Sequence, residues 1–411
     1  MNILIVSPDL EFGGVNSVVR NLTQYLHTRG HDIRMFHSGS SVLARHRMSR
    51  FGFPAVEHGL QLPFGDRHPA VSLAVFAVLF PIGLFQLLWR LWRWRIQVVN
   101  IHYPVDSLFY FALCRRILKF TLVCSVHGAD VFPAGKAPAR YSREMRLLLQ
   151  DADWIVAPSE DCRRRLAAVV PEHRGKMVFI HNGIDLQEFS NPQRMDAPER
   201  GRYILSVSAY KDQKGIDVLI RAMKTVSELH PDVKLILVGE GPLRGDLESL
   251  SEELGQNHRI EFLGRRSHGE VVELLHGCEV FVLPSRFETF GIALVEAMAC
   301  GRAVVAANTG GMPEIVRNGV NGFLVESDSP SGLVDGLNTL LDNLSLRRRL
   351  GEAAARDVRK RFSTASMGAA YERVFQLKPR QQGQDQTKIL PGWSGNKDDC
   401  GHGSASGATL L

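Results

Sequence analysis

Two glutamates enclose an almost wholly apolar stretch in the second half of the chain. Glu288 and Glu296 flank TFGIALV, and the nearly uncharged AMACGRAVVAANTGG follows. The preceding run VFVLPS predicts a buried strand, so Glu288 lies in the loop at its carboxyl end and Glu296 about one turn inside the next helix. Phe290 and Gly291 lead into that helix, whose first amides can hold phosphate oxygens while carboxylates accept hydrogen bonds from sugar hydroxyls. This pattern favours a sugar nucleotide over the alternative, a capped helix in which Glu296 forms a salt bridge.

Other candidate ligand groups follow predicted strands elsewhere in the chain. Gly13 and Gly14 precede a helix, where glycines let the backbone approach a ligand and the helix start favours an anion. Lys214 stands at the start of another helix and is suited to a phosphate. His127 and His102 each follow a predicted strand, where an imidazole can face a ligand. Each signal is weak alone, because flexible turns, surface lysines and structural histidines give the same pattern.

The elements that must position these groups alternate between apolar runs and helical stretches. Runs such as NILIVS, VVNIH and TLVCSVH predict buried parallel strands in an N-terminal domain over residues 1–187. A polar linker over 188–201 follows, and the alternation restarts over 202–362. The sequence therefore predicts an α/β protein with two Rossmann-like domains, whose parallel sheets face a central cleft and bind ligands at the carboxyl ends of the strands. A further helix over 363–376 and a polar, glycine-rich tail over 377–411, expected to be disordered, complete the chain.

A hydrophobic segment over residues 70–95 interrupts this pattern. Residues 70–89 carry no charge and are long enough to span a membrane, but Pro81 and Gly83 lie inside the run and RLWRWR follows it. A membrane-spanning helix at this place would separate strands of the N-terminal domain that must pair with one another. A buried helix and a helix at a membrane surface remain open, and the alternating Trp and Arg residues suit the surface.

Composition and charge place the chain among ordinary soluble globular proteins. The net charge of +6 and the pI near 9.0 are compatible with anionic substrates or an anionic membrane, and no nucleic-acid-binding motif accompanies the basic residues. The six cysteines lack metal-ligand spacing, and the start MNILIVSP has no basic region or cleavage site. We therefore expect a cytoplasmic protein without a metal site, peripheral on the inner face of the cell membrane.

The motifs together resemble the retaining glycosyltransferases of family 4, the glycogen-synthase-like enzymes with the two-domain GT-B fold. The resemblance covers about residues 1–375 and is strongest in the block from VFVLPSRFETFG to NGFLVE, over 280–326. The Gly13-Gly14 loop, the HNGID motif at 181–185 and Lys214-Gly215 support it in the same order. The last helix would then cross back to the first domain, as it does in the family.

The resemblance also implies roles for the matching residues. Glu288 would contact hydroxyls of the donor sugar, and Glu296 would bind the ribose hydroxyls. Lys214 and the amides of Phe290 and Gly291 would hold the diphosphate. From the other domain Gly14 would close on that diphosphate, His127 would lie near the reacting centre, and His102 would lie on the acceptor side.

The implied reaction is hexosyl transfer from a nucleoside-diphosphate sugar to an acceptor hydroxyl, with retained configuration and with no metal or cofactor. The basic first half favours a lipid-linked or surface-polysaccharide acceptor, as in lipopolysaccharide assembly. One departure from the family is Ser208-Ala209, where a Gly-Arg pair often supplies a second diphosphate ligand; Lys211 or Arg286 would have to compensate. Two alternatives stay open: a non-catalytic sugar-nucleotide-binding protein of a membrane complex, and a nucleotide-sugar epimerase of the same fold.

Overall fold

The computed structural model describes residues 1–7, 13–38, 45–49, 51–60, 62, 69–132, 141–190 and 201–377. The side chains of residues 45–47 and 69–72 lie outside this description. So do most of the predicted linker, residues 191–200, and the predicted disordered tail from residue 378 onward.

The N-terminal half forms one sheet with the strand order β3-β4-β2-β1-β5-β6-β7-β8. Among the described strands, β3 alone runs antiparallel to its neighbour, β4. The strands are β1 (Asn2–Val6), β2 (Asp32–Ser38), β3 (Arg45–Met48), β4 (Pro54–His58), β5 (Val98–His102), β6 (Thr121–Ser125), β7 (Trp154–Ala157) and β8 (Met177–Phe179). The helices that accompany them are α1 (Gly14–Thr28), α2 (Pro69–Arg93), α3 (Phe109–Ile117), α4 (Arg143–Asp151) and α5 (Glu160–Val169).

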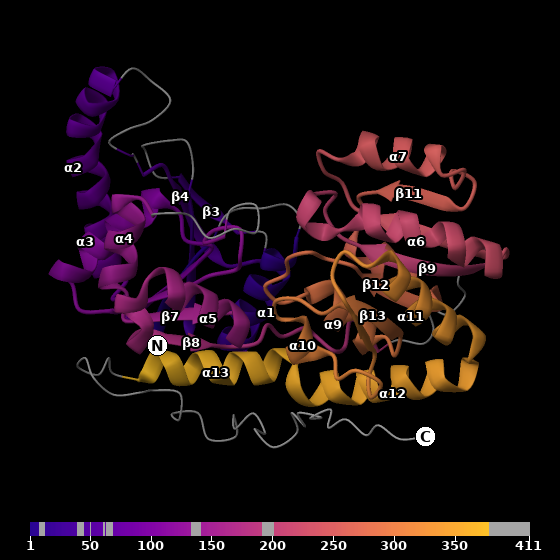
Figure 1. Cartoon of the computed structure of the whole chain (residues 1–411). Coiled ribbons are helices and arrows are strands. Elements are labelled where there is room, and N and C mark those ends of the chain that lie inside the picture. The colour runs from indigo at the N-terminus through magenta and orange to yellow at the C-terminus, as the bar shows by residue number, and fades with distance from the viewer. Residues whose placement is uncertain are drawn as a thin grey trace, which may run out of the picture.

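The C-terminal half forms a second, all-parallel sheet with the order β11-β10-β9-β12-β13-β14. Its strands are β9 (Arg202–Val207), β10 (Val233–Val238), β11 (Ile260–Gly264), β12 (Val280–Leu283), β13 (Ala303–Ala307) and β14 (Phe323–Val325). Its helices are α6 (Ile216–Leu229), α7 (Arg244–Glu253), α8 (His268–Gly277), α9 (Ile292–Ala299), α10 (Met312–Ile315), α11 (Pro330–Asp342) and α12 (Leu344–Arg361). The two sheets with their helices form the two bodies that Figure 1 shows side by side.

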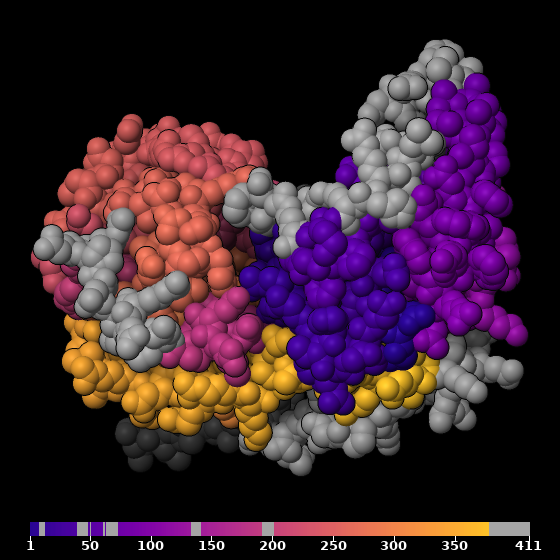
Figure 2. All heavy atoms as spheres, turned by 180° about the vertical axis from the view of Figure 1, so that it is seen from behind, coloured from indigo at the N-terminus to yellow at the C-terminus, as the bar shows by residue number. Residues whose placement is uncertain are grey.

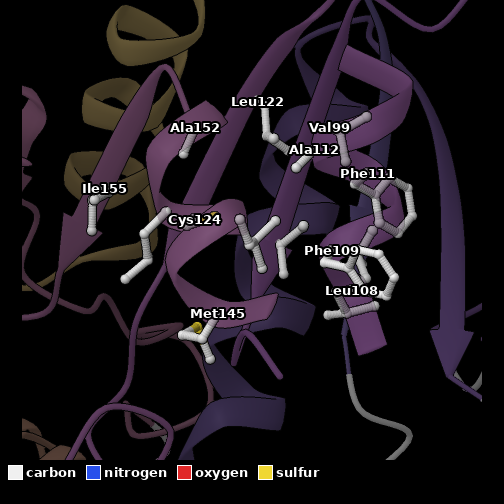
Figure 3. Close-up of a cluster of buried hydrophobic side chains, with 14 of the residues drawn as sticks. Val99, Leu108, Phe109, Phe111, Ala112, Leu122, Cys124, Met145, Ala152 and Ile155 are labelled. Carbon is white, nitrogen blue, oxygen red and sulfur yellow. The ribbon is translucent and has the colours of Figure 1, made fainter. Parts of the chain in front are cut away.

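Each sheet is buried on both faces, which explains why its strands are continuously apolar and do not alternate. In the N-terminal domain, one face of the sheet packs against α3 and α4, where Phe109, Phe111 and Leu148 fill the core (Figure 3). The opposite face packs against α1 and the last helix, α13 (Thr364–Gln376). The predicted α/β architecture with two parallel sheets is therefore confirmed.

Helix α13 belongs to the end of the chain but completes the core of the first domain. Tyr371 and Phe375 are buried beside Val18 and Leu22 of α1. The approach is close, because a Cβ atom on Gly368 would lie only 2.1 Å from the ring of Tyr25. Figure 1 shows α13 running along the underside of the N-terminal domain, next to β7 and β8.

Helix α2 has one buried face and one exposed face. Gly83, Leu87 and Leu91 are buried, and Phe80 lies against Phe109 and Tyr110 of α3 at ring-centroid distances of 6.2 and 5.1 Å. The opposite face is apolar and open to solvent. Figures 1 and 2 show α2 as a column that projects from the N-terminal domain.

Candidate active site

The predicted lysine and glutamate meet at the carboxyl end of the second sheet. The Nζ atom of Lys214 lies 2.7 Å from Oε2 of Glu288, and both side chains are largely buried. The two loops are joined by their backbones, since the amides of Arg286 and Phe287 donate to the Gln213 carbonyl at 3.0 and 3.1 Å. The sequence signal for this pair was the start of a helix at Lys214 and the end of a strand before Glu288, and the structure brings them into contact.

A glycine makes this contact of the two loops possible. Gly215 has a φ of 61°, and a Cβ atom there would lie 2.3 Å from the carbonyl oxygen of Pro284. A larger residue would be strained by its backbone conformation and would also push the two loops apart. Gly215 therefore fixes the position of the neighbouring Lys214 ammonium against Glu288.

The starts of two helices from different domains face each other next to this pair. Gly14, the first residue of α1, is so close to α9 that a Cβ atom on it would lie 3.5 Å from the side chain of Ile292. The N-cap residues Gly13 and Gly291 have φ angles of 120° and 100°, and neither supplies a side-chain cap. Because glycine has no side chain that could cap the first amides, these amides can face a ligand, and both helix dipoles present positive charge to the same place.

Phe290 lies just before α9 and Glu296 lies within it, and both side chains are buried. The Phe290 ring is buried against the rings of His181 and Phe362, so its backbone is firmly held. Glu296 is 7% exposed, and burial raises the pKa of its carboxyl to about 7, while the nearby charges of His268 and Arg20 lower it. The charges that act on Glu296 therefore come from His268, Glu188 and Arg20.

Arg20, Glu188 and His268 form a charged cluster with members from both domains. Glu188 accepts a hydrogen bond from Arg20 of α1 at 2.9 Å and lies 3.0 Å from Nε2 of His268, at the start of α8. The hydrogen bond with His268 and the charge of Arg20 lower the pKa of Glu188, although burial opposes them. All three side chains also act electrostatically on the Glu296 carboxyl: His268 and Arg20 lower its pKa, and Glu188 raises it.

His102 is the last residue of β5, His127 follows the neighbouring strand β6, and the two rings are in contact. Their facing nitrogens, Nε2 of His127 and Nδ1 of His102, are 3.1 Å apart. Burial lowers the pKa of His127 to about 4 and that of His102 well below its usual value, so both rings are neutral at pH 7. His127 is partly exposed, whereas His102 is fully buried. His102 therefore stands behind His127 and does not line the surface that an acceptor would touch.

Sequence reasoning missed the residues that hold the His127 loop. Asp130 accepts hydrogen bonds from the amides of His127 and Gly128 at 3.0 and 2.6 Å. From the other domain, the Thr289 hydroxyl donates to the His127 carbonyl at 2.7 Å. The spacing in HGAD is a local signal for the first contact. The second joins residues 162 positions apart, which no local pattern reveals.

Arg286 is not free to replace the missing diphosphate ligand. Its guanidinium binds both carboxylate oxygens of Asp217, at 2.8 and 2.7 Å, and Oδ1 of Asp328 at 2.5 Å. Lys211 and Ala209 are exposed at the edge of the same loop. Within the described residues, Lys214 is the cation of this loop that lies against Glu288.

Two family models match the chain, one in each half. The model described as Glycosyltransferase Family 4 matches residues 12–188, and the model described as Glycosyl transferases group 1 matches residues 188–357. An uncharacterized glycosyltransferase of Methanocaldococcus jannaschii is 29% identical over 282 residues, which make up 68% of this chain and 75% of the relative. N-acetyl-alpha-D-glucosaminyl L-malate synthase of Bacillus anthracis is 25% identical over 372 residues, or 88% and 93% of the two chains.

The fold is also that of solved glycosyltransferase-like structures. Anabaena HepE, solved in complex with UDP, matches with a TM-score of 0.72 and 20% identity, over 91% of this chain and 99% of that one. The predicted GT-B architecture is thereby confirmed. Since the two family models together span residues 12–357, the chain belongs to the group 1 and family 4 glycosyltransferases of the GT-B fold.

Proposed function

We propose that the protein transfers a hexosyl group from a nucleoside-diphosphate sugar to an acceptor hydroxyl, with retained configuration. The observation that carries this proposal is the meeting of the starts of α1 and α9, whose N-cap residues are both glycines, beside Lys214 and Glu288. This arrangement offers amides and an ammonium to a diphosphate, and a carboxylate to sugar hydroxyls. The relative solved with UDP supports a nucleotide donor.

In the proposed mechanism, the leaving diphosphate gains negative charge in the transition state. Lys214 and the first amides of α9 stabilise that charge because they are already in place before the reaction, so the mechanism requires no metal ion. The acceptor hydroxyl attacks from the face that the diphosphate leaves, and a departing phosphate oxygen takes its proton. Neutral His127 lies across the interdomain boundary from Glu288 and offers a hydrogen bond near the sugar. Glu296 binds the ribose hydroxyls.

Release of nucleoside diphosphate from a panel of UDP-, GDP- and ADP-sugars, with membrane extract as acceptor and no added metal, tests this proposal. We expect one donor to react, and Glu288→Ala or Lys214→Ala to lower kcat by about 100-fold or more. Glu228→Ala, an exposed carboxylate on α6, is the matched control and should leave kcat unchanged. Near-native kcat in either active-site variant would contradict the assignment.

The same panel of donors distinguishes the proposed transferase from a protein that binds sugar nucleotides without catalysis. A protein that only binds sugar nucleotides would release no diphosphate but would be stabilised by one nucleotide. At about 100 times its dissociation constant, that nucleotide should add roughly 2.7 kcal/mol to the free energy of unfolding. An epimerase would convert the sugar nucleotide into its epimer without any acceptor, and no nucleoside diphosphate would accumulate.

For the acceptor, we propose a lipid-linked glycan precursor at the inner face of the cell membrane, with α2 as the membrane contact. The part of α2 from Leu73 to Arg93 is long and apolar enough to cross a membrane, judged by length and composition alone. A spanning helix would be surrounded by lipid, and α2 would then have to leave α3 and expose Phe80, Leu87 and Leu91. A position along the membrane surface keeps those contacts.

The exposed face of α2 supports this position. Its large apolar residues recur every three or four positions and form one continuous stripe: Val78, Ile82, Phe85, Trp89 and Trp92. Contiguous apolar patches of this kind mark interaction sites, because soluble proteins rarely expose them. Exposed Arg93 and Arg95 follow the two tryptophans, which suits anionic lipid headgroups.

A further inference from the structure

A chain of buried hydrogen bonds leads from helix α13 to the candidate catalytic histidine. The Tyr371 hydroxyl lies 3.1 Å from Ser125 Oγ, and that hydroxyl donates to Asn100 Oδ1 at 2.8 Å. Asn100 Nδ2 lies 2.9 Å from Nε2 of His102, and His102 Nδ1 lies 3.1 Å from Nε2 of His127. The four residues behind His127 are buried, so water does not compete for these bonds.

The donors and acceptors along this row of hydrogen bonds can be assigned one after the other, starting from Tyr371. In the part of the chain that the structure describes, Ser125 is the hydrogen-bond partner of the Tyr371 hydroxyl, so the phenol donates and the serine hydrogen passes on to Asn100. Asn100 then turns its NH₂ group toward His102. An amide nitrogen only donates, so Nε2 of His102 accepts and the proton of this neutral ring is on Nδ1. That proton is donated to Nε2 of His127.

The consequence is a single tautomer for His127. Because its Nε2 accepts a hydrogen bond from His102, the proton of the neutral His127 ring is on Nδ1. Burial lowers the pKa of both histidines, which keeps the rings neutral at pH 7 and makes the tautomer well defined. The nitrogen that is not turned toward His102 therefore carries a hydrogen.

We propose that Tyr371, Ser125, Asn100 and His102 are positioning residues that hold His127 as a hydrogen-bond donor toward the sugar nucleotide. An N–H group suits a sugar hydroxyl or a phosphate oxygen, whereas the opposite tautomer would present a lone pair to the same oxygens. This inference rests on the proposed glycosyl transfer for its catalytic meaning. It also gives α13 a role beyond core packing, because its docking supplies the first donor of the chain.

The test combines ring-nitrogen NMR of histidine-labelled protein with kinetics. In the wild type we expect the His127 signals, identified by their loss in His127→Gln, to show a proton on Nδ1. Tyr371→Phe keeps the ring but removes the donor, so the Ser125–Asn100 pair can reverse. We then expect the proton to be shared between the two nitrogens, and kcat to fall about fivefold to tenfold while KM for the donor stays within about twofold.

Phe375→Leu is the matched control, since Phe375 lies on the same helix with its ring 5.9 Å from that of Tyr371 and takes no part in the chain. It should lower stability and leave the tautomer unchanged. A proton on Nε2 in the wild type, an unchanged tautomer in Tyr371→Phe, or an equal change in Phe375→Leu would each overturn the inference. The NMR measurement needs no substrate. An inactive protein with the expected tautomer would therefore count against the proposed function alone.

Discussion

Glu296 illustrates at the scale of one residue how a binding group can oppose stability. Its carboxyl is nearly inaccessible, and burial raises its pKa to about 7. An ionised carboxylate is the better acceptor for two ribose hydroxyls, yet the fold favours the protonated form until the pH reaches that value. Under the proposed function, the Glu296 carboxylate therefore serves the ligand at a cost to the stability of the folded state.

The stability of the protein should depend on pH through this group. The native pKa lies above the unfolded value of 4.5, so the native state binds the extra proton between pH 4.5 and about 7, and stability falls as the pH rises through that window. Glu296→Gln removes this dependence. We expect the variant to gain up to roughly 3 kcal/mol over the wild type at pH 8 and nothing at pH 4.5, measured by urea unfolding.

Glu372 is a control of opposite sign. Although burial opposes them, hydrogen bonds from His31 and Tyr25 and the charge of Arg29 hold its pKa below the usual value. Glu372→Gln should therefore lose stability at neutral pH, and the loss should vanish as the pH falls below about 4.5. A difference between Glu296→Gln and the wild type that does not change with pH would show that Glu296 is ionised in the folded protein.

At the scale of elements, the sequence predicted most of the fold because the central strands of each sheet are buried on both faces. Continuous apolar runs such as VFVL and AVVAA need no partner to be recognised, and β12 and β13 follow them. The limits of helices depend on local caps: α4 begins at Arg143 because the Ser142 side chain caps it. The orientation of α2 was unpredictable, since residues 70–89 carry no charge that would mark an exposed face. Only the tertiary contact with α3 decides which face is covered.

The exposed face of α2 predicts that the protein binds to anionic membranes through this helix. Phe85 and Trp92 are 69% and 65% exposed, and neither contributes to the core. Burying two large side chains in lipid should contribute about 1.5–3 kcal/mol each, so Phe85→Ser with Trp92→Ser should weaken binding to vesicles at least about tenfold. We expect the wild type to co-sediment with vesicles of phosphatidylglycerol and phosphatidylcholine, and less with phosphatidylcholine alone, because Arg93 and Arg95 favour anionic lipid.

The control for α2 changes exposed apolar residues far from it. Leu229→Ser with Val320→Ser removes comparable apolar surface from the C-terminal domain and should leave vesicle binding unchanged. The wild type could instead fail to bind vesicles and form a concentration-dependent dimer that the α2 variant does not form. In that case the apolar stripe of α2 is an interface between two copies of the protein, and the membrane proposal fails.

At the scale of the whole molecule, the active site depends on contacts between the domains that the sequence does not reveal. The motifs identified Glu288 and His127 separately, because each follows its own strand. Their alignment is set by Thr289, whose hydroxyl binds the His127 carbonyl, and by Ser159, whose hydroxyl donates to the Thr289 carbonyl at 2.6 Å. Side chains that join positions more than a hundred residues apart leave no periodicity or spacing to read, so the candidate groups were predictable but not their relative positions.

Glu314 makes three further contacts between the domains. Its carboxylate, on α10, accepts hydrogen bonds from the amides of Glu160 and Asp161 at the start of α5, at 3.0 and 2.8 Å, and lies 2.9 Å from Nε2 of His181. Burial raises the pKa of this carboxyl, but the hydrogen bonds outweigh that effect and keep it below its usual value. The negative charge also lies at the positive end of the α5 dipole.

Glu314→Ala should therefore loosen the two domains and disturb catalysis from a distance. Loss of a charged acceptor with several partners should lower the free energy of unfolding by about 2–3 kcal/mol, and calorimetry should resolve two transitions in place of one as the domains uncouple. Because Thr289 and Ser159 belong to the same contact, kcat/KM should fall as well. Glu352→Ala, which removes an exposed pair with Arg356 at 3.8 Å, should change stability by less than about 0.5 kcal/mol and leave kcat/KM unchanged. A single transition with normal kcat/KM in Glu314→Ala would mean that α13 alone holds the two domains in register.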